Sequence, residues 1–192
     1  MRTSSASAMR RGEQKVRIIG GRWRSRILRF PDLPSLRPTP DRVRETLFNW
    51  LGQDLSDLAT LDLFAGSGAL SFEALSRGAR LAVAVDRSRD AIAALRRNAG
   101  YLGATGLEAH AGDAEDFLRH GTRRFDVVFV DPPFGEVWID RLWPLLPAKL
   151  AGGGVVYVEQ PTAVDPPDGW ERLRHRHAGR VHYHLLRIAG PS

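Results

Sequence analysis

The feature that most limits the fold is a regular alternation of short apolar runs and helical stretches between residues 60 and 160. The apolar runs have the length of strands and occupy residues 60–65, 81–86, 107–112, 125–131 and 154–160. Helical patterns begin between them, near Ala69, Ser88, Ala114 and Trp138, and the natural stops are Gly78, Gly121 and Gly152. Uniformly apolar strands separated by helices form a parallel sheet that is covered on both faces. We therefore predict an α/β, doubly wound, Rossmann-like fold.

The last segment follows a different pattern. Two runs of alternating polar and apolar residues flank Ala178-Gly179, and no room for a helix lies between them. This pattern predicts an antiparallel hairpin appended to the edge of the sheet. Four histidines alternate along it, and we expect them to face solvent, although the same spacing permits a metal site: His175, His177, His182 and His184.

Composition limits the class of protein. A chain of 192 residues with 43% apolar residues can bury one good core, so we expect a single compact unit. The longest apolar runs are strand-sized and the N-terminus lacks an apolar signal segment, which predicts a soluble, cytoplasmic protein. The absence of cysteine excludes disulfides, thiolate metal ligands and a thiolate nucleophile.

The net charge of +6 is concentrated near the N-terminus. Residues 1–60 contain 12 Lys or Arg against 6 Asp or Glu, whereas the remaining residues contain 16 of each kind. Between residues 16 and 30, arginines alternate with apolar side chains around Gly20-Gly21, which predicts short strands with arginines and a tryptophan on one face. Such a face suits RNA phosphates and unpaired bases. The candidate RNA contacts are Arg17, Arg22, Trp23, Arg24, Arg26, Arg37 and Arg42.

Residues 37–52 predict a helix. Thr39 or Asp41 is a candidate N-cap, Pro40 suits the first turn and Gly52 suits the end. The apolar stripe is expected to pack against the core. The polar face includes Arg44, Glu45 and Asn49, and the pattern leaves open whether these side chains face solvent or have a function.

Ligands of doubly wound sheets bind beyond the carboxyl ends of the strands. At the first such end, Gly66 and Gly68 allow a tight turn and close approach to a ligand, and Asp86 at the second end can accept hydrogen bonds from a ribose. A dinucleotide would place its pyrophosphate near the carboxylate of Asp62. The loop also lacks the third glycine of a dinucleotide-binding motif, because Ser71 stands at that position. S-adenosylmethionine fits better, since its cationic groups favour a nearby carboxylate.

The third and fourth strand ends add two further features. Asp113 can bind an adenine amine or cap the following helix, and the cap is the commoner role. The fourth strand ends in Asp131, Pro132, Pro133 and Phe134. Asp131 and the Pro132 carbonyl can each accept one N–H of an aryl amine while Phe134 stacks on the base. Two such acceptors localise the nitrogen lone pair towards the methyl group of a sulfonium.

These motifs resemble the RsmD family of small-subunit ribosomal RNA guanine-N2 methyltransferases. FVDPPF is similar to the signature of amino-methyltransferases in general, and RPTPDRVRETLFNWL with LDLFAGSGALSFEALSRGA narrows the resemblance to this family. The resemblance covers the chain from Val16 to the C-terminal hairpin. It implies a class I methyltransferase fold, S-adenosylmethionine as the cofactor and 16S ribosomal RNA in the 30S subunit as the partner, with no obligate protein partner and no metal.

The resemblance also implies roles for individual residues. The cofactor-binding residues are Asp62, Phe64, Ala65, Gly66, Ser67, Gly68, Asp86, Asp113 and Ala114. The site of the target amine is Asp131, Pro132, Pro133 and Phe134. We predict a flexible basic tail over residues 1–15, an RNA-contacting extension over 16–52 and a methyltransferase domain over 53–192. Pro40 departs from the usual opening of the family motif, so contact of Thr39 with the cofactor stays open.

Alternative functions are an adenine-N6 methyltransferase on RNA or DNA, a non-catalytic ribosome assembly factor and, more distantly, a nicotinamide oxidoreductase. Guanine and adenine methyltransferases share the motif, so the motif does not distinguish them. Analysis of the methylated nucleoside in the product does. The intact amine site at Asp131, Pro132 and Phe134 weighs against a purely binding function.

Overall fold

The computed structural model describes residues 12–32, 39–133 and 138–190. The N-terminal hairpin consists of β1 (Glu13–Arg17), the 3-10 turn η1 (Gly21–Trp23) and β2 (Ile27–Pro31). The main sheet contains β3 (Ala59–Asp62), β4 (Leu81–Asp86), β5 (Leu107–Ala111), β6 (Phe125–Val130), β7 (Leu150–Gln160), β8 (Trp170–Ala178) and β9 (Val181–Ile188). The helices are α1 (Asp41–Leu51), α2 (Ala69–Ser76), α3 (Arg89–Leu102), α4 (Ala114–His120) and α5 (Ile139–Leu142), and a 3-10 turn η2 covers Pro147–Lys149.

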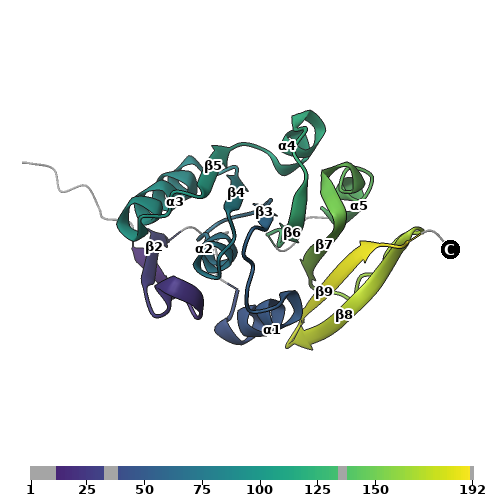
Figure 1. Ribbon diagram of the computed structural model, residues 1–192, viewed down its shortest axis with the longest axis horizontal. Coiled ribbons are helices and arrows are strands. Elements are labelled where there is room, and N and C mark those ends of the chain that lie inside the picture. The colour runs from purple at the N-terminus through teal and green to yellow at the C-terminus, as the bar shows by residue number, and fades with distance from the viewer. Residues whose placement is uncertain (1–11, 33–38, 134–137, 191–192) are drawn as a thin grey trace, which may run out of the picture.

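The main sheet has the strand order β5-β4-β3-β6-β7-β9-β8 (Figure 1). The first five strands of this order run parallel, and β9 pairs antiparallel with both β7 and β8. The predicted doubly wound sheet with an antiparallel C-terminal hairpin is therefore confirmed. The chain reverses its direction of winding between β3 and β6, which is where ligands bind in such sheets.

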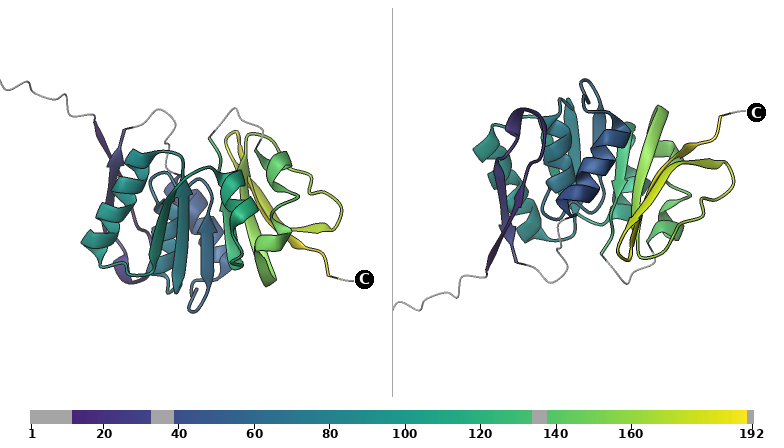
Figure 2. Two further views of the ribbon diagram at one scale, coloured as in Figure 1. Left: turned by 90° about the horizontal axis from the view of Figure 1, so that it is seen from above. Right: turned by 90° about the horizontal axis from the view of Figure 1, so that it is seen from below.

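Two apolar clusters cover the two faces of the sheet. One cluster joins the sheet to α1, α2, α3 and the N-terminal hairpin, and the other joins it to α4 and α5. Figure 2 shows the hairpin beside α3 at one end of the sheet and β8 with β9 at the other end. No helix among residues 12–32, 39–133 and 138–190 has the length and apolar character needed to cross a membrane.

The helical pattern after Trp138 is interrupted. We expected one helix as far as Gly152, but α5 ends at Leu142, and Gly152 lies inside β7. Pro144 and Pro147 lack the backbone N–H that a continuous helix needs, and Pro147 starts a 3-10 turn instead. The predicted stop at Gly152 is therefore wrong.

Helix α1 begins without a side-chain cap. Pro40 occupies the N-cap position, and neither Thr39 nor Asp41 caps the helix with its side chain. Asp41 is instead the first helical residue, where its negative charge favours the helix dipole. Gly52 ends the helix as predicted, with a φ of 95° that favours glycine.

The N-terminal hairpin packs directly on α2. A Cβ atom on Gly20 would lie 2.2 Å from the Arg77 guanidinium, and one on Gly21 would lie 2.0 Å from the Ser76 carbonyl oxygen. Gly21, which meets backbone atoms and has a φ of 72°, is therefore required for this close approach, whereas the Arg77 side chain could shift away from a Cβ atom at Gly20. Residues 13–15, which fall in the predicted tail, belong to β1.

One of the C-terminal histidines does not face solvent. His184 is fully buried, and its Nε2 accepts a hydrogen bond from the Val164 N–H over 3.2 Å. The expected exposure is therefore wrong for His184. Its ring stacks on that of His175 with centroids 4.3 Å apart, and the described part of the chain contains no group of three or more metal-ligating side chains placed to hold an ion.

Candidate active site

Three acidic residues lie at the carboxyl ends of three neighbouring strands. Asp62 ends β3, Asp131 follows β6 and Glu159 is near the end of β7. Asp62 is opposite Phe129, and Phe129 is opposite Tyr157 in the paired strands. Because side chains alternate along a strand, the three carboxyl groups share the face on which Phe129 and Tyr157 pack with α1.

Asp131 is held by a residue that precedes α1. The Thr39 hydroxyl donates a hydrogen bond to Asp131 Oδ2 over 3.1 Å. Burial raises the pKa of Asp131 to about 6, although the hydrogen bond from Thr39 acts in the opposite direction. Thr39 is therefore neither a helix cap nor solvent-exposed, because its side chain orients the carboxyl group of the predicted amine site.

Asp62 has an unused acceptor in the interior. Its Oδ2 accepts a hydrogen bond from the Ser71 hydroxyl over 2.9 Å, while Oδ1 is buried without a partner among the described residues. Burial raises the pKa of Asp62 to about 7, and the neighbouring charge of Asp131 adds to the shift. A buried carboxyl group with a free acceptor fits a cationic ligand, as the ammonium group of S-adenosylmethionine would be.

The glycine loop after β3 is shaped by backbone contacts with Asp86. Gly66 donates its N–H to Asp86 Oδ2 over 2.8 Å, and Ser88 donates its N–H to Asp86 Oδ1 over 2.7 Å. Gly68 has a φ of 77°, and a Cβ atom there would lie 2.2 Å from Leu95 Cδ2. The loop and the end of β4 are therefore brought together, as a cofactor site at these positions requires.

The other predicted residues of this loop also lie next to the strand ends. The Phe64 ring packs on Trp138 with centroids 5.2 Å apart, and the Ser67 hydroxyl accepts a hydrogen bond from the Ala69 N–H over 3.3 Å. Ala65 is buried and donates its N–H to the Val85 carbonyl over 2.9 Å. This pairing continues the contact between the glycine loop and β4.

Asp113 caps α4. Its Oδ1 accepts hydrogen bonds from the N–H groups of Glu115 and Asp116, and its Oδ2 accepts one from Arg87 Nε over 2.9 Å. Burial acts to raise the pKa of Asp113, but these hydrogen bonds outweigh it and the pKa lies below its usual range. The capping role is confirmed, and Ala114 is buried in the first turn of the helix.

The rest of the predicted amine site is described only in part. Pro132 is buried and Pro133 is partly buried directly after Asp131. Phe134 lies outside the described residues. Asp131, Pro132 and Pro133 therefore continue the chain directly from the end of β6, beside the same cluster of acids.

Sequence reasoning missed Glu159 and Tyr157. The Tyr157 hydroxyl donates a hydrogen bond to Glu159 Oε1 over 2.7 Å, and both side chains are buried. Burial raises the pKa of Glu159 well above its usual value, and the charge of Asp131 adds to the shift. The available signal was an acid at the end of an apolar strand, the same signal that marked Asp131.

Sequence reasoning also missed a buried charge network beneath the N-terminal hairpin. Arg44 is fully buried and lies 3.5 Å from Glu73, which forms a second ion pair with Arg77 at 2.8 Å. Glu73 Oε2 also accepts the N–H of Ile19 over 2.9 Å, and Arg44 donates to the carbonyl of Arg17 over 2.9 Å. Arg44 therefore connects α1, α2 and the hairpin, which answers the open question for this residue, whereas Glu45 and Asn49 are exposed.

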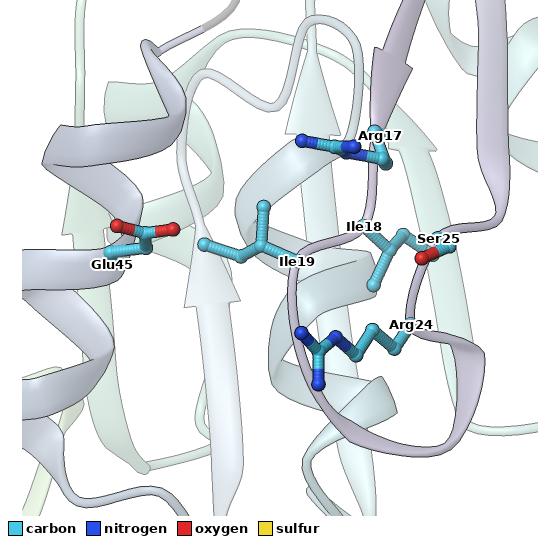
Figure 3. A pocket seen from close by; sticks show the side chains of 6 residues that line it. All are labelled: Arg17, Ile18, Ile19, Arg24, Ser25 and Glu45. Carbon is cyan, nitrogen blue, oxygen red and sulfur yellow. The ribbon is translucent and has the colours of Figure 1, made fainter.

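The predicted RNA contacts divide into exposed and buried residues. Arg17 and Arg24 line a surface pocket together with Glu45, where Figure 3 shows the side chains converging from β1, the hairpin turn and α1. The Trp23 ring is only 9% exposed and belongs to the core, with the Arg22 guanidinium 4.1 Å from its centre. The predicted exposed tryptophan is therefore wrong, because its apolar surface is more stable against the core.

The remaining arginines differ in their position relative to Asp131. Arg17 donates a hydrogen bond to Asp41 over 3.3 Å, two residues after Thr39, and Arg42 is exposed in the first turn of α1. Both therefore lie near the amine site, whereas Arg37 lies outside the described residues.

The turn of the hairpin is farther from the strand ends that bear the acids. It is held by Ser76, the last residue of α2, whose hydroxyl donates to the Gly20 carbonyl over 2.6 Å. Because α2 starts at the strand ends and runs away from them, Arg22 and Arg24 near this turn lie farther from the acids than Arg17 does, although Arg24 and Arg17 line one pocket. Arg26 follows the turn and donates a hydrogen bond to the Tyr101 hydroxyl over 3.1 Å.

Comparisons with known proteins agree with this arrangement. A family model described as conserved hypothetical protein 95 matches residues 16–187. The protein named ribosomal RNA small subunit methyltransferase D from Escherichia coli (strain K12) is 42% identical over 182 residues, which cover 91% of this chain and 90% of the relative. The protein of the same name from Haemophilus influenzae is 37% identical over 179 residues, which cover 89% of this chain and 93% of the relative.

Solved structures show the same fold. The yhhF protein from Escherichia coli superimposes with a TM-score of 0.83 at 38% identity, over 93% of this chain and 100% of that chain. The neighbours include class I methyltransferases, so the predicted fold is confirmed. Since the family model spans nearly the whole chain and the relatives align over their full domains, this chain belongs to the RsmD family.

Proposed function

We propose that this protein transfers a methyl group from S-adenosylmethionine to the exocyclic N2 amine of a guanine in 16S ribosomal RNA. The observation that carries the proposal is the Asp131 carboxyl group, partly buried at the end of β6 and oriented by Thr39. Relatives that share 42% and 37% identity are named ribosomal RNA small subunit methyltransferase D, which supports ribosomal RNA as the substrate.

The cofactor site is assigned to residues around the glycine loop. S-adenosylmethionine, when bound, supplies a methyl group on a positively charged sulfur. The open acceptor of Asp62 would bind the ammonium group, and ionised Asp62 would favour the positive charge. Asp86 would accept a hydrogen bond from the ribose beside Gly66 and Gly68, and Asp113 with Ala114 would contact the adenine. Phe64, Ala65 and Ser67 would line the same loop.

The target amine is assigned to the turn that follows β6. Asp131 accepts one N–H of the amine, and the Pro132 carbonyl accepts the other. These two acceptors localise the nitrogen lone pair, which is otherwise delocalised into the purine ring, and they direct it at the methyl group. Phe134 stacks on the base. Asp131 acts in its ionised form, because a carboxylate accepts the N–H more strongly than the neutral acid does.

The RNA is assigned to the basic side chains near this turn. Arg17 and Arg42 are exposed next to the Thr39 segment and would bind phosphates that flank the target nucleotide. The described residues pack around one main sheet, so the shape of the substrate would supply much of the specificity. We therefore propose the assembled 30S subunit, in the cytoplasm, as the substrate.

The test is methyl transfer from labelled S-adenosylmethionine to unmodified 30S particles and to protein-free 16S RNA, followed by nucleoside digestion. We expect N2-methylguanosine, formed mainly on particles, and loss of this product in the Asp131→Asn variant without loss of cofactor binding. N6-methyladenosine would overturn the target base but keep the amine chemistry. Cofactor binding without any methylated product would favour a non-catalytic assembly factor.

A further inference from the structure

We infer that Glu159 is the residue that selects guanine, by accepting the N1–H of the target base beside the amine held at Asp131. This inference rests on the proposed function and adds to it the group that distinguishes guanine from adenine. Glu159 would contact the substrate directly and is therefore a specificity-determining residue.

The register of the sheet places Glu159 next to Asp131. Val130 on β6 is opposite Val158 on β7, and each acid follows its valine directly. Each acid comes two residues after a ring that packs towards α1, Phe129 or Tyr157, so both acids project to that same face of the sheet. Neighbouring strands are about 4.8 Å apart, a separation that one edge of a base can span.

Hydrogen bonds orient Glu159 as an acceptor. The Tyr157 hydroxyl donates to Glu159 Oε1 over 2.7 Å, and Tyr157 keeps its proton because burial raises its pKa well above the usual value. Burial raises the pKa of Glu159, and the hydrogen bonds of Tyr157 and of the Thr39 hydroxyl, which donates to Asp131, act against this shift. Thr39 therefore lies between the two acids, and both are fixed on the same side of the site.

The chemistry of the base edges decides which base fits two neighbouring acceptors. Guanine presents its N2 amine next to an N1–H, so two donors stand side by side. Adenine presents its N6 amine next to N1, which is an acceptor, and cytosine likewise presents N4 next to the acceptor N3. The guanine N1–H would favour the ionised form of Glu159 against the effect of burial, because it donates to the carboxylate, and this carboxylate would repel the lone pair of the other two bases.

The burial of this cluster supports a ligand that brings N–H donors. Glu159 is 5% exposed and Asp62 is 2% exposed, and Asp62 Oδ1 has no partner among the described residues. A buried acceptor without a donor costs free energy, so Asp62 Oδ1 indicates that a donor arrives there with a ligand. The cofactor ammonium group accounts for Asp62 and the target amine for Asp131, which leaves Glu159 for the second donor of guanine.

The test compares two analogues of the target guanine in the RNA substrate. 2-Aminopurine keeps the amine at C2 but has a lone pair at N1, whereas 6-thioguanine keeps the N1–H and changes only the group at C6. We expect the wild-type protein to methylate guanine and 6-thioguanine at comparable rates. It should methylate 2-aminopurine at least about tenfold more slowly, because a buried acceptor then faces a lone pair.

The Glu159→Gln variant should reverse this preference. Tyr157 donates to the amide oxygen, so the NH2 group takes the place of the second carboxylate oxygen and can donate to N1 of 2-aminopurine. The ratio of guanine to 2-aminopurine methylation should fall at least about tenfold. Glu171→Gln, the same change at an exposed residue of β8, is the matched control and should leave the ratio unchanged.

The ratio is measured within one protein sample, so partial unfolding of a variant does not change it. The double variant Tyr157→Phe with Glu159→Gln frees the amide to rotate and should recover part of the guanine preference. If wild type makes N2-methylguanosine but Glu159→Gln keeps the wild-type ratio, the role of Glu159 is overturned while the proposed function stands. If wild type makes no N2-methylguanosine, the proposed function fails first, and the inference fails with it.

Discussion

The Thr39 hydroxyl donates a hydrogen bond to Asp131 Oδ2 over 3.1 Å, which links the segment before α1 to the end of β6 across 92 residues of sequence. The bond joins the basic N-terminal part of the chain to the carboxyl group that we assign to the target amine. Burial raises the pKa of Asp131, and Thr39 partly offsets that shift. Thr39 is therefore a positioning residue, which acts on the reaction through Asp131.

Removal of the Thr39 hydroxyl should slow turnover without weakening cofactor binding. Thr39→Val keeps the shape of the side chain but leaves Asp131 free to rotate and easier to protonate. A hydrogen bond to a charged group contributes about 1.5–3 kcal/mol, so kcat should fall roughly 10- to 100-fold. The measurements are kcat in the methyl transfer assay and the Kd for S-adenosylmethionine.

Two further variants separate this effect from a general loss of stability. Thr39→Ser keeps a hydroxyl and should keep most of the activity. Thr46 lies on α1, where its hydroxyl donates to the Arg42 carbonyl over 2.9 Å, and Thr46→Val should have little effect. Equal losses in Thr39→Val and Thr39→Ser would show that the hydrogen bond to Asp131 is not what matters.

Activity should rise with pH as Asp131 ionises. Its pKa is about 6, and the ionised form is the one that accepts the amine N–H, so kcat/KM should increase through pH 6 and then level. The Thr39 hydrogen bond lowers this pKa, so Thr39→Val should move the inflection to higher pH. A profile with the same inflection in both proteins would assign the titration to another group.

Asp62 favours cofactor binding in its ionised form, but it should lower the free energy of unfolding of the protein near neutral pH. Its pKa is raised to about 7 from 3.8, so the folded protein holds a proton that the unfolded chain has lost. Folding therefore becomes less favourable as the pH rises towards 7. Asp62→Asn removes this penalty, and its stabilising effect should grow by on the order of 2 kcal/mol between about pH 5.5 and about pH 8.

Chemical unfolding of wild type and Asp62→Asn at both pH values measures this difference. Asp165→Asn, at a side chain that is 99% exposed, is the control and should change little at either pH. Asp62→Asn should also bind S-adenosylmethionine more weakly, because the amide carries no charge for the ammonium group. A stabilisation that does not depend on pH would contradict the assignment of the raised pKa to Asp62.

Local patterns predicted the parallel sheet, the glycine loop and the Asp113 cap, because each depends on residues that are near one another in sequence. The links from Thr39 to Asp131 and from Arg44 to Glu73 were not predictable, because they require the packing of α1 on the sheet. Trp23 and His184 were misplaced for the same reason: alternation shows that two faces differ, but not which face a neighbouring element covers.

The buried network around Glu73 should be required for folding. Glu73→Gln leaves Arg77 buried without a counter-charge and leaves Arg44 with the partly exposed Asp41 as its one remaining partner among the described ion pairs. Loss of one partner from such a network costs about 3–5 kcal/mol. Urea unfolding should detect this loss, whereas Glu13→Gln, which removes the exposed partner of Arg29, should cost about 0–1 kcal/mol. Similar losses in both variants would mean that burial of the network contributes nothing.

The positions of the arginines predict which of them bind RNA phosphates near the reaction. Arg17 and Arg42 lie next to the Thr39 segment, so replacing either by Ala should weaken binding to the RNA substrate. Each lost phosphate contact should lower the slope of log Kd against log salt by about 0.9. Arg123→Ala is the control. Arg123 lies just before β6, at the end of the strands opposite to the acids, and forms an ion pair with Glu108, so its loss removes the same charge but should leave the slope unchanged.

The hairpin arginines form the second half of this test. Replacing Arg22, Arg24 and Arg26 together by Ala should also lower the slope, because these exposed side chains extend the basic surface from Arg17 towards the turn. Since they lie away from Asp131, the loss should appear in the affinity for the particle and not in kcat at saturating substrate. An unchanged slope in this triple variant would restrict the RNA contact to the surface around α1.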